Sequence, residues 1–149
     1  LRCAAVDLLS RRDHSRLELQ RKLRPKAASA EDLETLLDEL AERRWQSDER
    51  FAEAYVNSRS QRGQGPLRMK HELRNKGVAD TEISAAMEES DSDWYQSAIN
   101  VAEKKFGQTP DLSDLKLKAR VYSFLAYRGF TGDQISYVLD RLGSFSADD

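Results

Sequence analysis

Residues 65–87 read GPLRMKHELRNKGVADTEISAAM and contain the pattern on which the predicted architecture depends. Apolar side chains recur three or four residues apart on each side of Gly77, as they do on helices that bury one face. Proline at the first turn of a helix lacks only an N–H that would have no partner there, and Gly77 suits the turn that ends that helix. The stretch therefore predicts a helix, a tight turn and a second helix.

The same apolar pattern occurs three times along the chain without gaps. Its positions are Leu19, Leu23, Leu33, Leu36 and Leu37 in the first copy, Met69, Leu73, Ile83, Ala86 and Met87 in the second, and Val121, Leu125, Ile135, Val138 and Leu139 in the third. Gly129 of the third copy aligns with Gly77, whereas the first copy has Ala27 at this place. Units of this size bury little apolar surface alone, so we expect neighbouring copies to stack.

The repeat predicts an all-α fold of three tandem three-helix repeats that form an elongated, curved array. The repeats occupy residues 1–46, 47–91 and 92–149, the last with a short C-terminal tail. Ser15 with Glu18 and Thr131 with Gln134 form capping boxes, which mark the starts of two helices. The expected helices cover residues 3–12, 15–24, 30–43, 48–60, 66–76, 80–89, 92–106, 113–127 and 132–141.

Composition restricts the class of protein. Hydrophobic residues make up 39 % of the 149 residues, and no apolar run approaches the roughly 20 residues that span a bilayer. The lone cysteine, Cys3, cannot form an internal disulfide, so the fold does not depend on an oxidising compartment. We expect a cytoplasmic monomer with no membrane partner. Because the first residue is Leu rather than Met, we also expect a natural N-terminal stretch to be missing.

Charge is distributed unevenly between the predicted helices. Residues 31–42 and 80–93 carry acids and no base, whereas the middle helix of each repeat is basic. A basic stripe repeated along the array would bind nucleic-acid phosphates by releasing counterions. The alternative is that basic and acidic helices neutralise each other through surface ion pairs, each worth little. The predicted nucleic-acid- or filament-binding residues are Arg59, Arg62, Arg68, Lys70, Arg74, Lys76, Lys104, Lys105, Lys116, Lys118, Arg120 and Arg128.

A helix, a glycine-containing turn and a second helix also resemble the helix-turn-helix of DNA-binding proteins. In that motif the second helix enters the major groove. Here the second helix is strongly acidic, over 31–42 and 80–89, and phosphates would repel it. We therefore do not expect these helices to read a DNA sequence.

Residues with catalytic or ligand-binding chemistry are sparse. Gly63-Gln64-Gly65-Pro66 has too few glycines to cradle a nucleotide. Neither His14 nor His71 has a Cys or His at metal-ligand spacing, and we expect both at the surface or its boundary. Cys3 has no His and acid nearby in sequence to make it a nucleophile. We expect no enzyme activity, no metal and no cofactor.

The aromatic residues divide into two groups. Tyr55 and Tyr127 could stack on nucleic-acid bases, although their helical spacing favours core packing. The residues expected only in the core are Trp45, Trp94, Tyr122, Phe124 and Phe130.

Short motifs follow one another in a fixed order along nearly the whole chain. They are Leu8-Leu9-Ser10-Arg11-Arg12 followed by Ser15-Arg16-Leu17-Glu18-Leu19 and Lys22-Leu23; Asp48-Glu49-Arg50-Phe51-Ala52; Gly63-Gln64-Gly65-Pro66 followed by Glu72-Leu73 and Lys76-Gly77-Val78; and Arg128-Gly129-Phe130. In this order and spacing they resemble the RecX family, bacterial regulators of the RecA recombinase. The chain departs from the family pattern at Trp45-Gln46-Ser47 and at Arg24-Pro25-Lys26-Ala27, which lacks a glycine, and neither departure touches the charge pattern.

The resemblance implies a helical array that binds RecA–DNA filaments in their helical groove and meets single- or double-stranded DNA. Such a protein would lower the ATPase and strand-exchange activity of RecA, by blocking the groove or dislodging subunits. It would act in homologous recombination, DNA repair and the SOS response. Two alternatives stay open: a general nucleic-acid-binding helical module without a filament target, and a protein–protein adaptor that uses only the acidic helices.

Overall fold

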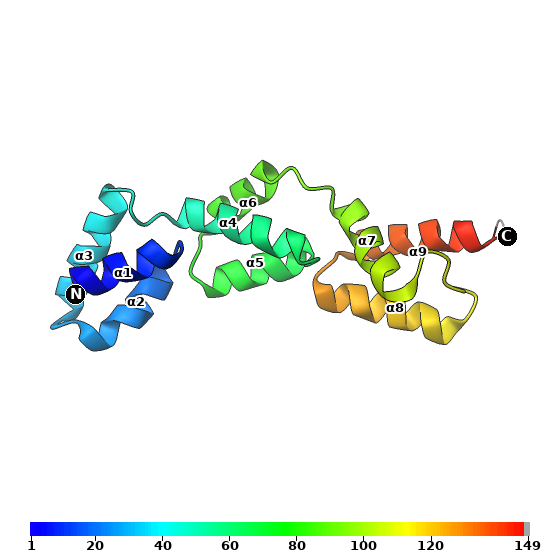
Figure 1. Cartoon of the computed structure of the whole chain (residues 1–149), viewed down its shortest axis with the longest axis horizontal. Coiled ribbons are helices and arrows are strands. Elements are labelled where there is room, and N and C mark those ends of the chain that lie inside the picture. Colours follow the sequence, from blue (N-terminus) through cyan, green and yellow to red (C-terminus); the bar gives the residue numbers. More distant parts are fainter. Residues whose placement is uncertain (148–149) are drawn as a thin grey trace. The chain divides into compact units, whose positions relative to one another are not determined.

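The computed structural model describes residues 1–147, and this part of the chain consists of helices joined by short loops, with no strand (Figure 1). The predicted all-α repeat array is confirmed. Most helix ends lie within two residues of their expected places, and the last helix continues beyond 141. The helices are α1 (Arg2–Arg11), α2 (Arg16–Leu23), α3 (Ala30–Glu42), α4 (Asp48–Gln61), α5 (Pro66–Asn75), α6 (Asp80–Glu89), α7 (Trp94–Phe106), α8 (Leu115–Arg128) and α9 (Gly132–Ala147), with a 3₁₀ turn η1 (Arg24–Lys26) after α2.

Side-chain caps explain where several helices begin. Ser15 Oγ accepts from the Glu18 N–H at 3.1 Å, and the Glu18 carboxylate accepts from the Ser15 N–H at 3.1 Å. Thr131 and Gln134 make the same reciprocal pair before α9. Each cap satisfies N–H groups that have no partner inside the first turn of a helix. Both predicted capping boxes are therefore confirmed.

The chain packs into two compact units that do not coincide with the sequence repeats. Unit 1 contains Leu1–Val56 and Glu72–Ser90, and unit 2 contains Asn57–His71 and the described residues from Asp91 onward. The boundary between the units crosses α4 and α5, so each of these two helices contributes residues to both units. The three repeat boundaries concern the sequence pattern and stay a prediction.

Each unit is organised around the repeated apolar positions. In unit 1 the leucine stripe of α3 packs on α1 and α2 in one core. In unit 2 the core is formed by α7, α8, α9 and Phe130. All fifteen positions of the threefold pattern are buried except Met87 and Leu139, which are half-buried. The apolar spacing thus marked the core correctly.

Three aromatic assignments were wrong. Trp45 is 44 % exposed and Tyr122 47 % exposed, whereas both were expected in the core. Tyr127, for which core packing was favoured, is 76 % exposed. On α8 the buried stripe is taken by Val121 and Leu125, so Tyr122 and Tyr127 lie off it. Trp45 follows α3 in a loop, where the Arg43 guanidinium lies 5.2 Å from its ring centre.

The burial of the remaining aromatic residues and of the histidines agrees with expectation only in part. Phe130 and Tyr55 are buried, whereas Trp94 and Phe124 are half-buried. His71 is exposed, as expected. His14 was expected at the surface or its boundary and is instead buried in a polar network of unit 1.

Candidate nucleic-acid interface

Unit 2 contains a close main-chain contact between the start of α5 and the turn that follows α8. The Gly65 N–H donates to the Arg128 carbonyl at 2.7 Å, and the Leu67 N–H donates to the Gly129 carbonyl at 2.9 Å. A Cβ on Gly129 would lie 2.3 Å from the Cβ of Arg68, and Gly129 also has a φ of +98°. Only glycine fits such a position without strain. The contact, named here the second joint, brings Arg68 and Arg128 together from distant parts of the sequence.

Beside the second joint, four of the predicted cations line one groove of about 510 Å³. They come from the end of α4 and its loop, from α7 and from α8, and they are Arg62, Lys104, Lys105 and Arg128. Hydroxyl and amide side chains of Ser60, Gln61, Ser97 and Asn100 complete much of the lining. Among the residues described for this groove there is no Asp or Glu. The groove therefore offers positive charge and neutral hydrogen-bonding groups to an anion.

Phe124 organises the charged wall of this groove. The Lys105 ammonium lies 5.1 Å and the Arg128 guanidinium 5.2 Å from its ring centre. Arg128 also donates to the Arg62 carbonyl at 3.1 Å. Cation–π contacts of this kind hold a positive group without neutralising it. Phe124 was expected only as core, so this role was missed, although its spacing of four residues from Arg128 was available in the sequence.

A smaller hollow of about 300 Å³ continues the basic surface along α8. It shares Lys105 and Phe124 with the groove and adds Arg120 and Ser123. Lys116, one turn before Arg120, and Lys118 are exposed on the same helix. Lys105 and Arg120 thus share one surface of unit 2, whereas Lys118, two residues from Arg120, lies on another side of α8.

The other predicted residues fall into two sets. Arg59, Arg68 and Lys70 belong to unit 2 and are half-buried, with the Arg68 guanidinium 5.3 Å from the Tyr127 ring centre. Arg74 and Lys76 belong to unit 1, and both have carboxylate partners. Arg74 pairs with Asp80 at 2.8 Å, and Lys76 with Glu18 at 3.3 Å. For these two residues, the alternative interpretation of mutual neutralisation has direct support.

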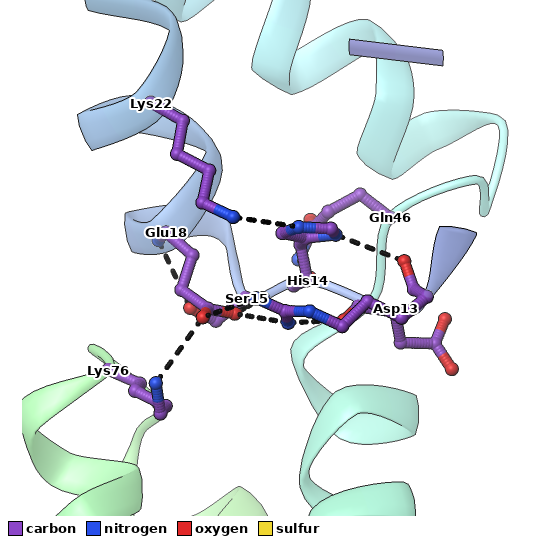
Figure 2. Close-up of polar contacts among 8 residues, drawn as sticks. Asp13, His14, Ser15, Glu18, Lys22, Gln46 and Lys76 are labelled. Carbon is purple, nitrogen blue, oxygen red and sulfur yellow. Dashed lines mark hydrogen bonds and ion pairs between the residues drawn. The ribbon is translucent and has the colours of Figure 1, made fainter. Parts of the chain in front are cut away.

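Lys76 and Glu18 belong to a contact in unit 1, named here the first joint, where the turn after α5 meets the start of α2 (Figure 2). A Cβ on Gly77 would lie 2.7 Å from the Cβ of Leu17. Glu18 also accepts two hydrogen bonds from Arg12, at 3.2 and 3.1 Å. Burial alone would raise the pKa of Glu18, but Arg12, the Ser15 N–H and Lys76 together lower it to about 2. The Glu18 carboxylate is therefore ionised, and its partners Arg12, Ser15 and Lys76 all lie within unit 1.

His14 lies next to this cluster (Figure 2). Its Nδ1 is 3.0 Å from the Arg12 carbonyl, and its Nε2 is 3.4 Å from the Lys22 ammonium. Gln46 reaches the His14 carbonyl at 3.4 Å. Burial lowers the pKa of His14, and the nearby cations add to this effect. These contacts serve the packing of unit 1 and do not form a second binding site.

The repeat alignment relates the two joints residue by residue. Arg12 corresponds to Arg62, Glu18 to Arg68, and Lys76 to Arg128. The first joint therefore holds a carboxylate between two cations, whereas the second joint has arginine at all three places. The two joints therefore differ in charge at one corresponding position, Glu18 in the first and Arg68 in the second.

The described part of the chain offers neither a membrane span nor a cluster of metal ligands. None of its helices is long and apolar enough to cross a membrane. Across the same residues, no three His, Cys, Asp or Glu side chains are grouped so that they could hold a metal ion.

Comparison with known proteins gives a consistent result. Family models for the second and third three-helix domains of RecX match residues 47–87 and 91–139. The Regulatory protein RecX of Neisseria meningitidis serogroup C is 48 % identical over 139 residues, which cover 93 % of this chain and 88 % of that protein. That of Pseudomonas putida strain GB-1 is 44 % identical over 140 residues, with the same coverage. The crystal structure of RecX from Lactobacillus salivarius has the same fold, with a TM-score of 0.80 at 22 % identity over 95 % of this chain and 93 % of that one.

Proposed function

This chain belongs to the RecX family of regulatory proteins, and we propose that it regulates the RecA recombinase by binding RecA–DNA filaments through the groove of unit 2. The single observation that carries this proposal is the groove lined by Arg62, Lys104, Lys105 and Arg128 with no carboxylate among its described lining residues. Binding there would lower RecA's ATPase and strand-exchange activity. The protein would act in the cytoplasm as a monomer and without catalysis of its own.

The chemistry of the groove suits a nucleic-acid backbone. Lysine and arginine replace condensed counterions on phosphates, and each such contact makes the fall of log K with log salt steeper by about 0.9 on duplex DNA and about 0.7 on single strands. Hydroxyl and amide groups, such as those of Ser97 and Asn100, are typical partners for phosphate and sugar oxygens. Contacts of this kind fix position without reading sequence. This fits a regulator that has to bind along any DNA.

The two alternative functions are distinguishable on the same surface. A general nucleic-acid-binding module would use the groove equally well on naked DNA and on filament. An adaptor that binds protein only through its acidic helices would use α3 and α6. On α3, Glu34 and Asp38 both pair with Arg16, at 2.6 and 2.7 Å, and on α6 Asp80 pairs with Arg74 at 2.8 Å. Because part of the acidic surface of these helices is neutralised inside unit 1, we favour the basic groove as the binding surface.

The test reverses the charge of the groove. The variant Arg62→Glu/Lys104→Glu/Lys105→Glu is compared with Arg21→Glu/Arg24→Glu/Lys26→Glu, which makes the same change in net charge with exposed cations of unit 1. Each protein is titrated against labelled DNA and against RecA-coated DNA at several salt concentrations, and RecA ATPase is followed. Circular dichroism checks that both variants are folded.

We expect the groove variant to bind at least tenfold more weakly, to inhibit RecA correspondingly less, and to show a smaller salt slope. The control variant should retain most binding and inhibition. Equal losses in both variants would show that only net charge matters. Full inhibition by a folded groove variant would place the functional surface elsewhere. Binding that is the same for naked and RecA-coated DNA, without ATPase inhibition, would favour the general module.

A further inference from the structure

Tyr127 is an exposed aromatic side chain in the last turn of α8, and the core does not use it. The residue is 76 % exposed, and the Arg68 guanidinium lies over its ring, 5.3 Å from the ring centre. Arg68 is held in this place by the second joint, because the Gly129 backbone packs directly against its Cβ. The ring and the guanidinium therefore form a preorganised pair at the surface of unit 2.

The helical spacing of α8 places this pair next to the basic groove. Tyr127 follows Phe124 by three residues and Ser123 by four, so these side chains lie on one side of the helix. Phe124 and Ser123 line the hollows that hold Lys105 and Arg120. Arg128, the next residue, lines the groove itself. An anionic polymer lying in the groove would thus pass close to the exposed ring.

We propose that Tyr127, backed by Arg68, is a stacking site for an unpaired base of a single-stranded nucleic acid whose phosphates lie in the groove. The inference rests on the proposed function, since it needs the phosphates in that groove. A tyrosine ring offers a flat face to any base, and an arginine beside it adds a cation–π contribution, so binding is tolerant of sequence. Bases in a duplex are already stacked on their neighbours and cannot reach the ring. The site would therefore give a preference for single strands.

A contact with an apolar protein surface is the competing use of the ring. Leu115 and Tyr122 of α8 are exposed as well. Tyr127 differs from them because it has Arg68 over its ring and Arg128 beside it, and because it adjoins a groove whose described lining lacks a carboxylate. This setting favours a ligand that combines negative charge with aromatic faces. Nucleic acid has both.

The test uses the full chain with Tyr127→Ala and Tyr127→Phe. Tyr122→Ala is the matched control, because it removes another exposed tyrosine from the same helix. The probes are a labelled oligodeoxythymidylate, an abasic oligonucleotide of the same length, and a duplex of the same length. The groove reversal Arg62→Glu/Lys104→Glu/Lys105→Glu is measured in parallel, and circular dichroism confirms folding.

We expect Tyr127→Ala to weaken binding of the oligodeoxythymidylate about tenfold, since a stacked base contributes roughly that much or more. Its binding of the abasic strand and the duplex should stay within twofold of wild type. Tyr127→Phe keeps the ring and should bind like wild type, as should Tyr122→Ala. The groove reversal should weaken binding to all three probes.

Each other outcome has a definite meaning. If Tyr127→Ala binds the oligodeoxythymidylate like wild type while the groove reversal weakens all probes, the stacking site is overturned and the proposed groove stands. If the groove reversal has no effect on any probe, the proposed function fails first. An equal loss on abasic and normal strands would mean that the ring does not contact a base. The Tyr127 variants are also titrated against RecA-coated DNA, as the groove variants are, and a loss confined to that DNA would make Tyr127 a protein contact and overturn the inference.

Discussion

The two joints between successive repeats share a backbone plan and differ in charge. In each joint, a glycine with a positive φ follows the middle helix of one repeat and packs against the first turn of the middle helix of the repeat before it. Gly77 (φ +80°), after α5, packs against Leu17 of α2. Gly129 (φ +98°), after α8, packs against Arg68 of α5. The first joint is further held by an ion pair between Lys76 and Glu18. The second is held by main-chain hydrogen bonds from Gly65 and Leu67.

The difference shows how a repeat protein can separate packing from binding. The Glu18 side chain is 13 % exposed and forms ion pairs with Arg12 and Lys76. Its negative charge is therefore neutralised inside the first joint. Where the second joint has Arg68 instead, main-chain hydrogen bonds from Gly65 and Leu67 hold the contact, and Arg128 of the same joint lines the groove. The groove proposed to bind phosphates therefore lies beside the joint that has arginine, and not a carboxylate, at the place of Glu18.

The largest expected effect comes from adding a methyl group at the glycines. Gly129→Ala would put a Cβ 2.7 Å from the backbone N of Arg68 in a left-handed conformation, and we expect a loss of about 4 kcal/mol in unfolding free energy. Gly77→Ala meets only the Leu17 side chain, so about 2 kcal/mol is expected. Denaturant unfolding followed by tryptophan fluorescence measures both.

Two features of the chain make this comparison sharp. Trp45 lies in unit 1 and Trp94 in unit 2, so Trp94→Phe and Trp45→Phe backgrounds report each unit separately. Gly132→Ala is the control, because a Cβ there meets nothing within 4 Å. If Gly129→Ala costs no more than Gly132→Ala, the close backbone approach does not hold the second joint.

Exchanging the charges of the joints comes next. Glu18→Arg would remove a cap and place a third cation beside Arg12 and Lys76, with an expected loss of about 3 kcal/mol. The reciprocal Arg68→Glu would remove the guanidinium from the exposed Tyr127 ring and should cost less than Glu18→Arg, about 1 kcal/mol, because position 68 holds no capping carboxylate. It should nevertheless weaken DNA binding more than tenfold. Parallel unfolding and DNA-binding titrations test the pair.

The outcome of the exchange bears directly on the comparison. A large stability loss for Arg68→Glu would mean that arginine at this place is needed for packing, as Glu18 is in the first joint. Unchanged DNA binding by a folded Arg68→Glu would remove the second joint from the binding surface.

Much of the fold was predictable because its signals are local. The stripe Leu33, Leu36, Leu37 and Leu40 and the capping pair Ser15–Glu18 depend on residues a few positions apart, and both are as expected. The end of α9 was placed too early, although Leu142 continues its buried stripe and is itself fully buried. The expected end of α9 was wrong because the apolar spacing was followed only to residue 141, although it continues to Leu142.

The site was less predictable because charge pairing is not local. Basic composition found the cations, but nothing near Lys76 in sequence shows that its partner is Glu18, 58 residues away. The exposed state of Tyr127 could have been inferred from its angle to Val121 and Leu125 on the helix, whereas the guanidinium over its ring comes from another repeat. The sequence shows where the cations are, whereas the packing at each joint determines which of them pair with a carboxylate, as Lys76 does, and which line the groove, as Arg128 does.

Acid titration should isolate the ion pairs of the first joint. The pKa of Glu18 is lowered from 4.5 to about 2, so its stabilisation is complete above pH 4.5 and is lost as the pH falls through about 2. Glu18→Gln should therefore be less stable than wild type by about 2 kcal/mol at pH 7 and nearly equal to it at pH 2. Unfolding of both proteins at a series of pH values measures this. A difference that does not shrink in acid would show that shape, and not charge, stabilises this joint.

The smallest effect is expected at His14, the position that corresponds to Gln64 in the second joint. Burial lowers the pKa of His14, and the charges of Arg12 and Lys22 act in the same direction, while the hydrogen bond to the Arg12 carbonyl and the Glu18 carboxylate oppose them. The folded protein therefore takes up a proton here less readily than the unfolded chain, whose His pKa is 6.5. Stability is complete above pH 6.5 and declines as the pH falls below it. His14→Gln places the residue of the second joint in the first joint and should remove this decline in stability. The melting temperature, measured by thermal unfolding at pH 7 and pH 5, should then differ by a few degrees less than it does in wild type.

Thermal unfolding of Gln64→His, which makes the reverse exchange, shows whether the second joint acquires the pH dependence that the first joint loses. If wild type and His14→Gln lose stability in parallel over this range, the dependence does not come from His14.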